Sequence, residues 1–271
     1  MKKIIIATDF SPAAENAMRY AADMALHVKA DLVLFHVCQM PPNYAEAPVT
    51  SLVSLEDDAW ESLENRRMQL SDRMAGDGNI ECFVKSGNFL RELRNLCELH
   101  SPHLVVVGSR GTSTLERFFF GDHSGKAVEK IEWPVLAIPL GHTYQDVKKI
   151  CLACDMENVR ETVPVDSIRE LVNQFDGKLH ILNTGRFGEY HPDLVVEAGI
   201  LESMFKKENP VFHFTAGDNT DRGILDFVSK NAIDLLLVIP KSRGVFKRIL
   251  THHHTRFLVL HCPVPVLGFH K

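Results

Sequence analysis

The chain repeats itself once along its length, and this repeat constrains the fold more than any other feature. The apolar run at 3–9, KIIIATD, returns at 149–155 as KICLACD, 146 positions later (149 − 3). Three further landmarks recur in the same order, at 31–37 and 178–183, at 102–107 and 233–238, and at 133–138 and 264–269. Four landmarks in one order indicate two copies of a single fold. The polar stretch 141–145 is the predicted linker, which gives one domain over 1–140 and a second over 147–271.

Each half alternates short apolar runs with longer amphipathic stretches, the pattern of a parallel sheet covered by helices on both faces. Strands are expected at 3–8, 31–37, 79–84, 103–107 and 134–138, and in the second half at 149–154, 178–183, 210–215, 234–239 and 265–269. Helices are expected after the N-cap Ser11 and at roughly 54–75, 88–100 and 121–131, and Pro164 is expected to open the first helix of the second half. Each half is therefore predicted to be a doubly wound, Rossmann-like α/β domain with a five-stranded parallel sheet.

Composition narrows the classes of partner. Lys and Arg total 30 against 35 Asp and Glu, a formal net charge of −5, so the positive charge of a general nucleic-acid binder is missing. The apolar run at the N-terminus is too short for a signal peptide or a membrane span, and no later run is longer. The sequence therefore predicts a cytoplasmic protein that binds neither nucleic acid nor membrane.

Two loops compete for the ligand crevice, which in an open parallel sheet lies beyond the carboxyl ends of the strands. One loop follows the first strand and carries Asp9. The other follows the fourth strand and carries Gly108, Gly111 and Gly121, the last of which opens a helix. Glycines after a strand allow close backbone approach, and the free N–H groups of a helix start suit a phosphate. These glycines predict a nucleotide crevice, with ordinary turn glycines as the alternative.

The glycine spacing resembles that of a known family. The pattern of Gly, two residues, Gly, nine residues and Gly, followed by Ser124, is similar to the ATP-binding loop of the universal stress proteins. The segment Thr8-Asp9-Phe10-Ser11 is similar to the first-strand signature of that family, and both halves together resemble a tandem member. The resemblance implies an adenine nucleotide alpha-hydrolase-like fold that binds ATP or another adenine nucleotide, with or without Mg²⁺.

The resemblance also implies roles for particular residues. In nucleotide-binding members the aspartate and the last residue of strand two hold the adenosine, while the glycines and the following hydroxyl residues hold the phosphates. Carried over by position, the site residues are Asp9, Val37, Gly108, Gly111, Gly121 and Ser124. No catalytic residue and no metal ligand is assigned.

Two departures from the family pattern shape the expectation. Asp122 stands where binding members have Ser or Thr after the third glycine, so a carboxylate occupies the place of an anion. The second half keeps Asp155 and Gly244 but loses the glycine that opens the helix. We therefore expect a nucleotide in the first domain alone and a degenerate, empty second domain.

The function expected from this sequence is that of a nucleotide-responsive regulatory or protective module without appreciable enzymatic turnover. The first alternative is a scaffold that binds no nucleotide and acts through protein contacts, which Asp122 favours. The second alternative is a slow ATPase. The final strands of the two halves are expected to pair within the chain as a pseudo-dimer, and the chain is expected to form a homodimer and to bind a protein partner of unknown identity.

Overall fold

The computed structural model describes residues 2–38, 49–109, 121–185, 192–217, 219–240 and 252–270. The chain divides into two compact units, Met1–Tyr144 and Gln145–Lys271. Each unit contains parallel strands with helices between them. The α/β class predicted from the sequence is confirmed.

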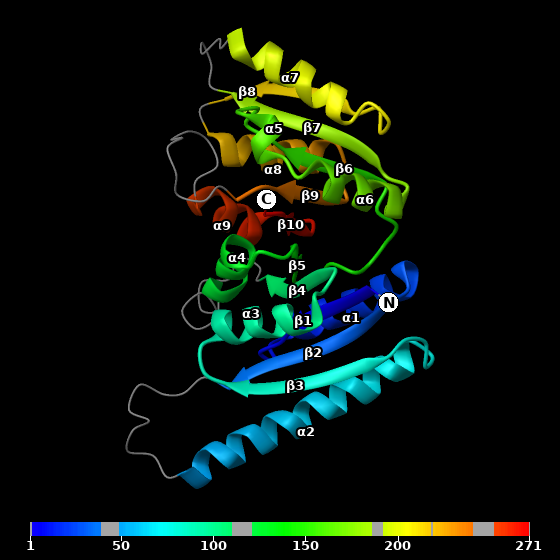
Figure 1. Ribbon diagram of the computed structural model, residues 1–271, viewed down its shortest axis with the longest axis vertical. Helices are drawn as coiled ribbons and strands as arrows, with labels where there is room; N and C mark the ends of the chain where they lie inside the picture. The colour runs from blue at the N-terminus through cyan, green and yellow to red at the C-terminus, as the bar shows by residue number, and fades with distance from the viewer. Residues whose placement is uncertain are drawn as a thin grey trace. The chain divides into compact units, whose positions relative to one another are not determined.

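The first unit contains a doubly wound parallel sheet. Its elements are β1 (Lys2–Ala7), α1 (Pro12–Val28), β2 (Ala30–Cys38), α2 (Val49–Arg73), β3 (Ile80–Ser86), α3 (Phe89–His100), β4 (Leu104–Ser109), α4 (Gly121–Lys130) and β5 (Val135–Pro139). The strands lie in the order β3-β2-β1-β4-β5, and all described pairs are parallel. Helix α1 contacts α2, and α3 contacts α4. Figure 1 shows α3 in front of this sheet and α1 behind it, so helices cover both faces.

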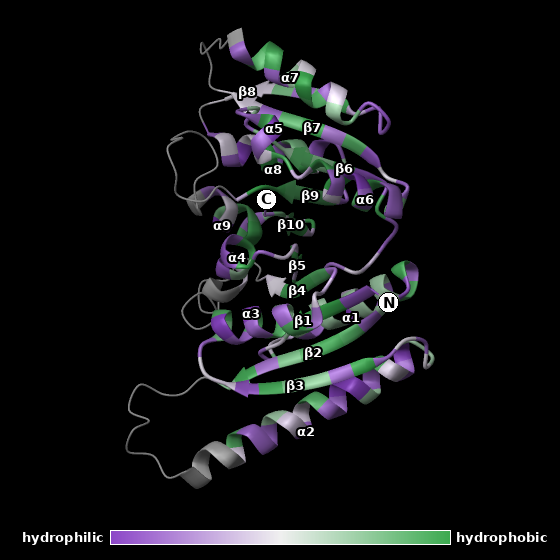
Figure 2. Ribbon diagram, in the orientation of Figure 1, coloured by the Kyte–Doolittle hydropathy of each residue, from purple (hydrophilic) through white to green (hydrophobic). Residues whose placement is uncertain are grey.

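The strands are apolar because both faces of the sheet are covered. Ile4, Ile5 and Ile6 of β1 are completely buried although successive side chains point to opposite faces. In Figure 2 the inner strands are coloured as hydrophobic, whereas the helices alternate between hydrophobic and hydrophilic residues. The core of the unit therefore lies in two layers, one on each side of the sheet.

Local chemistry explains where helix α1 begins. The Ser11 hydroxyl accepts a hydrogen bond from the Ala14 N–H at 3.3 Å, and Pro12 occupies the first helical position. The buried Asn16 donates from Nδ2 to the carbonyl oxygens of Pro139 at 3.1 Å and His142 at 3.0 Å. These bonds hold the chain that leaves β5 against α1.

The second unit repeats the same plan. Its elements are β6 (Lys149–Ala153), α5 (Val159–Thr162), α6 (Val165–Phe175), β7 (Lys178–Gly185), α7 (Pro192–Met204), β8 (Val211–Ala216), α8 (Thr220–Lys230), β9 (Leu235–Val238), α9 (His252–His261) and β10 (Val266–Gly268). Its strands lie in the order β10-β9-β6-β7-β8, and all described pairs are parallel. All ten strands predicted from the sequence are present, and no end is displaced by more than two residues.

One helix prediction was wrong. Pro164 was expected to open the first helix of the second half, but the short helix α5 precedes it and Pro164 is the N-cap of α6. Val163 between the two helices has an extended backbone, φ −91° and ψ 119°. The pyrrolidine ring disfavours the helical conformation in the residue before proline, so the segment equivalent to α1 is divided here.

The helices among the described residues are all too short or too polar to cross a bilayer.

Candidate functional site

The strand order of the first unit places a switch point between β1 and β4. The chain builds β1, β2 and β3 in one direction and then returns to add β4 and β5 on the other side of β1. Loops that leave the carboxyl ends of two such strands diverge to opposite faces and leave a crevice between them. Asp9 follows β1, and Gly108 and Ser109 end β4. The two loops selected from the sequence therefore flank the switch point.

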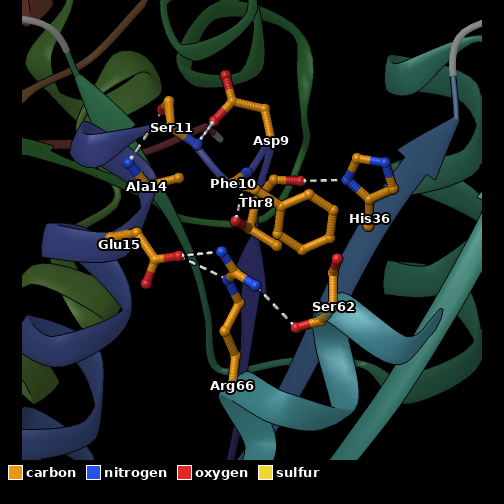
Figure 3. Close-up of polar contacts among 9 residues, drawn as sticks. All are labelled: Thr8, Asp9, Phe10, Ser11, Ala14, Glu15, His36, Ser62 and Arg66. Atoms are coloured by element: carbon orange, nitrogen blue, oxygen red, sulfur yellow. Dashed lines mark hydrogen bonds and ion pairs between the residues drawn. The ribbon is translucent and has the colours of Figure 1, made fainter. Parts of the chain in front are cut away.

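The loop after β1 is a compact turn (Figure 3). The Thr8 hydroxyl accepts from the Phe10 N–H at 3.0 Å, and Asp9 Oδ1 accepts from the Ser11 N–H at 3.0 Å. Phe10 has a φ of 62°, in the left-handed region that bulky residues seldom adopt. Asp9 is exposed, and its second carboxylate oxygen points away from the turn in Figure 3. The turn thus presents one carboxylate oxygen at the switch point.

Side chains from two further elements pack against Phe10. Its ring stacks on that of His36 from β2, with centroids 4.4 Å apart and planes at 22°. The Arg66 guanidinium from α2 lies over the Phe10 ring at 4.6 Å from its centroid. Arg66 is held by Glu15 of α1, whose Oε1 accepts from Nε at 2.5 Å, and by the Ser62 carbonyl oxygen at 2.9 Å (Figure 3). The turn, α1, α2 and β2 are therefore joined at one place.

The protonation state of His36 follows from its contacts. Its Nδ1 lies 2.8 Å from the Thr8 carbonyl oxygen, which can only accept, so Nδ1 carries the hydrogen. Burial lowers the pKa of His36 below its usual 6.5, and the Arg66 charge lowers it further, while the bond to Thr8 and the Asp9 carboxylate oppose the shift. His36 is thus neutral near pH 7, and its Nε2 is a hydrogen-bond acceptor.

The backbone carbonyl of Val37 lies beside the turn that follows β1. The Thr8 N–H donates to the Phe35 carbonyl oxygen on the β1 side at 2.9 Å, and the Gly87 N–H donates to the Cys38 carbonyl oxygen on the β3 side at 3.1 Å. Since backbone groups alternate between the two neighbouring strands, the Val37 carbonyl is directed to the β1 side, where β1 has already ended. Val37 as a whole is buried, with 8% of its surface exposed. Cys38, and not Val37, is the last residue of β2.

Close packing requires a glycine at position 108, and the sequence alone did not reveal this requirement. A Cβ atom at this position would lie 2.6 Å from the carbonyl carbon and oxygen of Ala13 and 2.7 Å from the Ala14 nitrogen. The first turn of α1 therefore rests directly on the end of β4. Gly111, the second predicted glycine, lies outside the described residues.

The third glycine, Gly121, is the first residue of α4, as predicted. Ser124 lies in the first turns of that helix and is buried, with 6% of its surface exposed. Asp122 also belongs to the first turn of α4. The start of α4 thus combines a buried hydroxyl residue with an acidic residue.

The turn after β6 in the second unit closely resembles the turn after β1. Met156 has a φ of 56°, its N–H donates to Cys154 Sγ at 3.3 Å, and the Glu157 N–H donates to Asp155 Oδ1 at 3.2 Å. Asn183 Nδ2 donates to the Cys154 carbonyl oxygen at 3.0 Å, in the place of His36.

The chemistry around the copied turn differs. Asp155 is 7% exposed, whereas Asp9 is exposed. The positions of Gly108 and Ser124 hold Ile239 and Thr255, by the offset 265 − 134 = 131 that relates the prolines before β5 and β10. The second unit keeps a buried hydroxyl but lacks the glycine at the end of its fourth strand.

Sequence reasoning did not single out Phe10, His36 or Arg66 as site residues. The only available signal was the repeat itself, because alignment of the halves pairs His36 with Asn183 and Phe10 with Met156. Arg66 has no such signal, since it reaches the turn only through the packing of α2.

Comparisons with known proteins agree with this fold. The model of the universal stress protein family matches residues 1–139. A universal stress protein of Methanocaldococcus jannaschii is 22% identical over 139 residues, which are 51% of this chain and 81% of that protein. A universal stress protein of Archaeoglobus fulgidus has a similar structure, with a TM-score of 0.76 at 15% identity over 99% of this chain and 98% of that one. A functionally unknown protein of Pseudomonas aeruginosa has a TM-score of 0.61 at 11% identity over 100% of this chain and 93% of that one.

Proposed function

The chain belongs to the universal stress protein family, and from this premise we propose that its first unit binds an adenine nucleotide at the switch point between β1 and β4. In this proposal the protein is a nucleotide-responsive regulatory or protective module. The observation that carries the proposal is the exposed Asp9 carboxylate, held in a fixed turn at the carboxyl end of β1 with one oxygen directed outward.

The described residues fit the adenosine end of such a ligand. An exocyclic amino group of the base is a donor, and the free Asp9 oxygen and the Val37 carbonyl are acceptors at the same edge of the sheet. Because both acceptors are fixed by bonds within the turn and the strand, a ligand would not have to order them.

The phosphates of the ligand would meet the start of α4. Gly121 begins α4, whose free N–H groups and dipole favour an anion. Asp122 in the same turn opposes one, since a carboxylate about 4 Å from a phosphate charge costs roughly 1 kcal/mol in water and about 4 kcal/mol at an effective dielectric of 20. Mg²⁺ would reverse this sign by bridging the two anions.

Binding in the first unit alone is part of the proposal. The family model matches residues 1–139, and the turn of the second unit carries a buried Asp155 in place of the exposed Asp9. A ligand would therefore find an exposed carboxylate at only one of the two turns.

The two aspartates provide the test. Asp9→Asn keeps an oxygen that accepts from the Ser11 N–H, so the turn is retained while the charge is lost. We expect this variant to bind adenosine and ATP roughly tenfold to a hundredfold more weakly, because a hydrogen bond to a charged group contributes about 1.5–3 kcal/mol.

Asp155→Asn is the matched control, since it alters the same turn in the second unit. Its affinity for both ligands should equal that of the wild type. Equal weakening by the two substitutions would contradict binding in the first unit alone. Absence of binding to the wild type, with and without Mg²⁺, would leave the scaffold that acts through protein contacts as the function of the chain.

Pairing of the final strands of the two halves, and dimerisation of the chain, stay predictions. Cross-linking and sedimentation of the purified protein would test the second of them.

A further inference from the structure

β8 forms the outer edge of the sheet in the second unit, and among the described strands it pairs with β7 alone. Gly217, directly after β8, donates from its N–H to the Gly185 carbonyl oxygen of β7 at 3.0 Å. Since backbone groups alternate along a strand, those of Phe212, Phe214 and Ala216 are directed away from β7. β8 therefore presents a row of N–H and C=O groups on its outer side.

The corresponding edge strand of the first unit is protected against pairing, whereas β8 is not. β3 carries Glu81 and Lys85, and charged side chains oppose the addition of a further strand. The 25-residue helix α2 contacts β3 and runs along it in Figure 1. β8 contains no Asp, Glu, Lys or Arg, and α7, which has 13 residues, has its main described contacts with α5. β8 is thus an edge strand without the usual protection.

The exposed side chains of this region are apolar. Phe214 is 55% exposed, Ala216 is also exposed, and the Phe212 ring stacks on that of Phe214 with centroids 6.4 Å apart. The large apolar side chains that are exposed among the described residues of the second unit all belong to α7 and β8: Val195, Val196, Val211 and Phe214. Exposed apolar side chains that gather in one region are typical of a surface that contacts another protein.

We propose that β8 is an interface between two copies of this chain, in which the two β8 strands pair antiparallel about a two-fold axis at Phe214. The outward-directed groups determine this register, because such residues form the hydrogen-bonded pairs of an antiparallel ladder. Phe214 then lies opposite its counterpart in the second copy, and Phe212 lies opposite Ala216. Each outward N–H and C=O group of these three residues finds a partner.

The chemistry of β8 favours a second copy as the occupant of this edge. A two-fold axis gives both strands the same set of bonds, so one strand is complementary to itself. Because β8 carries no fixed charge, no like charges meet across the axis. The exposed Lys206 and Lys207 precede β8, and Asp221 in the first turn of α8 follows it. Antiparallel pairing brings the amino end of one strand to the carboxyl end of the other, so these opposite charges approach.

Sedimentation velocity of the full chain over a range of concentrations measures the dissociation constant of the dimer. Phe214→Lys removes an exposed ring and places two ammonium groups opposite each other at the axis, so this constant should rise about thirtyfold or more. Leu99→Lys is the matched control, since it adds the same charge at a leucine of α3 that is 71% exposed. Its dissociation constant should equal that of the wild type.

Cysteine variants test the register. The Cα atoms of a hydrogen-bonded antiparallel pair lie about 5.5 Å apart, a distance that a disulfide can span. Phe214→Cys should therefore give a covalent dimer when treated with oxidised glutathione. Phe212→Cys is the control, because the two cysteines would lie about 14 Å apart along the strands and should not react with each other. The wild type should give no covalent dimer, since its six cysteines are all buried or half-buried.

Three results would overturn the inference. A wild type that is monomeric at every concentration would leave the edge of β8 to an extended segment of another protein. A dimer that Phe214→Lys does not weaken would have to form through other elements, such as the final strands. Equal cross-linking of Phe212→Cys and Phe214→Cys would exclude the axis at Phe214. None of these measurements involves a nucleotide, so this inference and the proposed function can fail independently.

Discussion

Phe10 and Met156, 146 residues apart (156 − 10), have the same left-handed backbone conformation, with φ of 62° and 56°. The left-handed region costs a bulky residue on the order of 1–2 kcal/mol, which persists only where the surroundings fix it. Two hydrogen bonds fix this conformation in each turn. The side chain two residues earlier, Thr8 or Cys154, accepts from the N–H of the left-handed residue. The aspartate accepts from the N–H of the residue that follows the left-handed one. The likeness of the two turns therefore extends to single hydrogen bonds.

Substitution of Gly108 should destabilise the first unit whether or not a ligand binds. In Gly108→Ala the new Cβ would lie 2.6 Å from the Ala13 backbone, so α1 must move away from β4. We expect a loss of about 1–3 kcal/mol in the free energy of unfolding, measured by chemical denaturation.

Gly199→Ala is the control for that measurement. This glycine lies within α7, and an added Cβ would meet nothing within 4 Å. Replacement by alanine should stabilise the helix by up to about 1 kcal/mol. Equal effects of the two substitutions would contradict the close approach of α1 to Gly108.

Lowering the pH should reduce the stability of strand β8. His180 Nδ1 lies 2.9 Å from His213 Nε2, and one shared hydrogen joins the rings. Burial lowers the pKa of both below 6.5, and for His180 the charges of His213, Lys149 and Lys178 add to the effect. The stabilisation is complete above about pH 6.5 and is lost as the pH falls through the lowered values, because protonation of both rings favours the unfolded state.

Hydrogen exchange of the β8 amides at pH 7.5 and pH 5 measures this loss once the intrinsic rates are taken into account. Protection should fall by about 1 kcal/mol more in the wild type than in His213→Asn. The same fall in both proteins would show that the imidazole pair is not its cause.

Loss of Arg169 should destabilise the second unit strongly. Its Nε donates to Glu208 Oε1 at 3.0 Å, and the Glu208 side chain is only 2% exposed. Arg169→Met leaves that carboxylate buried without its charge partner, a change that costs about 3–5 kcal/mol. Arg67→Met removes the exposed pair with Glu64, which water screens, and should cost much less. Chemical denaturation of both variants checks the difference, and similar losses would contradict it.

Asp122→Ser should change the binding of the phosphates of the ligand and leave the binding of its adenosine unchanged. If the carboxylate opposes the phosphates, its removal should tighten ATP binding in the absence of Mg²⁺ by roughly 1–4 kcal/mol and leave adenosine unchanged. Calorimetry with both ligands, with Mg²⁺ and with chelator, gives the comparison. An equal change for ATP and adenosine would show that Asp122 acts through the fold of α4.

The fold was largely predictable because strands buried on both faces are continuous apolar runs. β1 illustrates this, with three adjacent isoleucines completely buried. The place of Asp9 was predictable for a related reason, since a residue just after such a strand lies at the carboxyl edge of the sheet.

The remaining features depend on side chains that meet only in the folded chain. Arg66 reaches Phe10 from α2, 56 residues later (66 − 10), and no periodicity records that contact. The role of Gly108 in packing depends on the distance between β4 and α1. The division of the helix at Pro164 could be anticipated only in part, because Pro at a helix start and Pro between two helices give the same sequence signal.

The most direct test of the account is the number of adenine nucleotide sites on the wild-type chain. Titration calorimetry with ATP in the presence of Mg²⁺, and in parallel with adenosine, measures it without any substitution. The account predicts one site per chain for each ligand, because the aspartate at the switch point of the first unit is exposed and its counterpart Asp155 is buried. Two sites per chain, or none for either ligand, would contradict it.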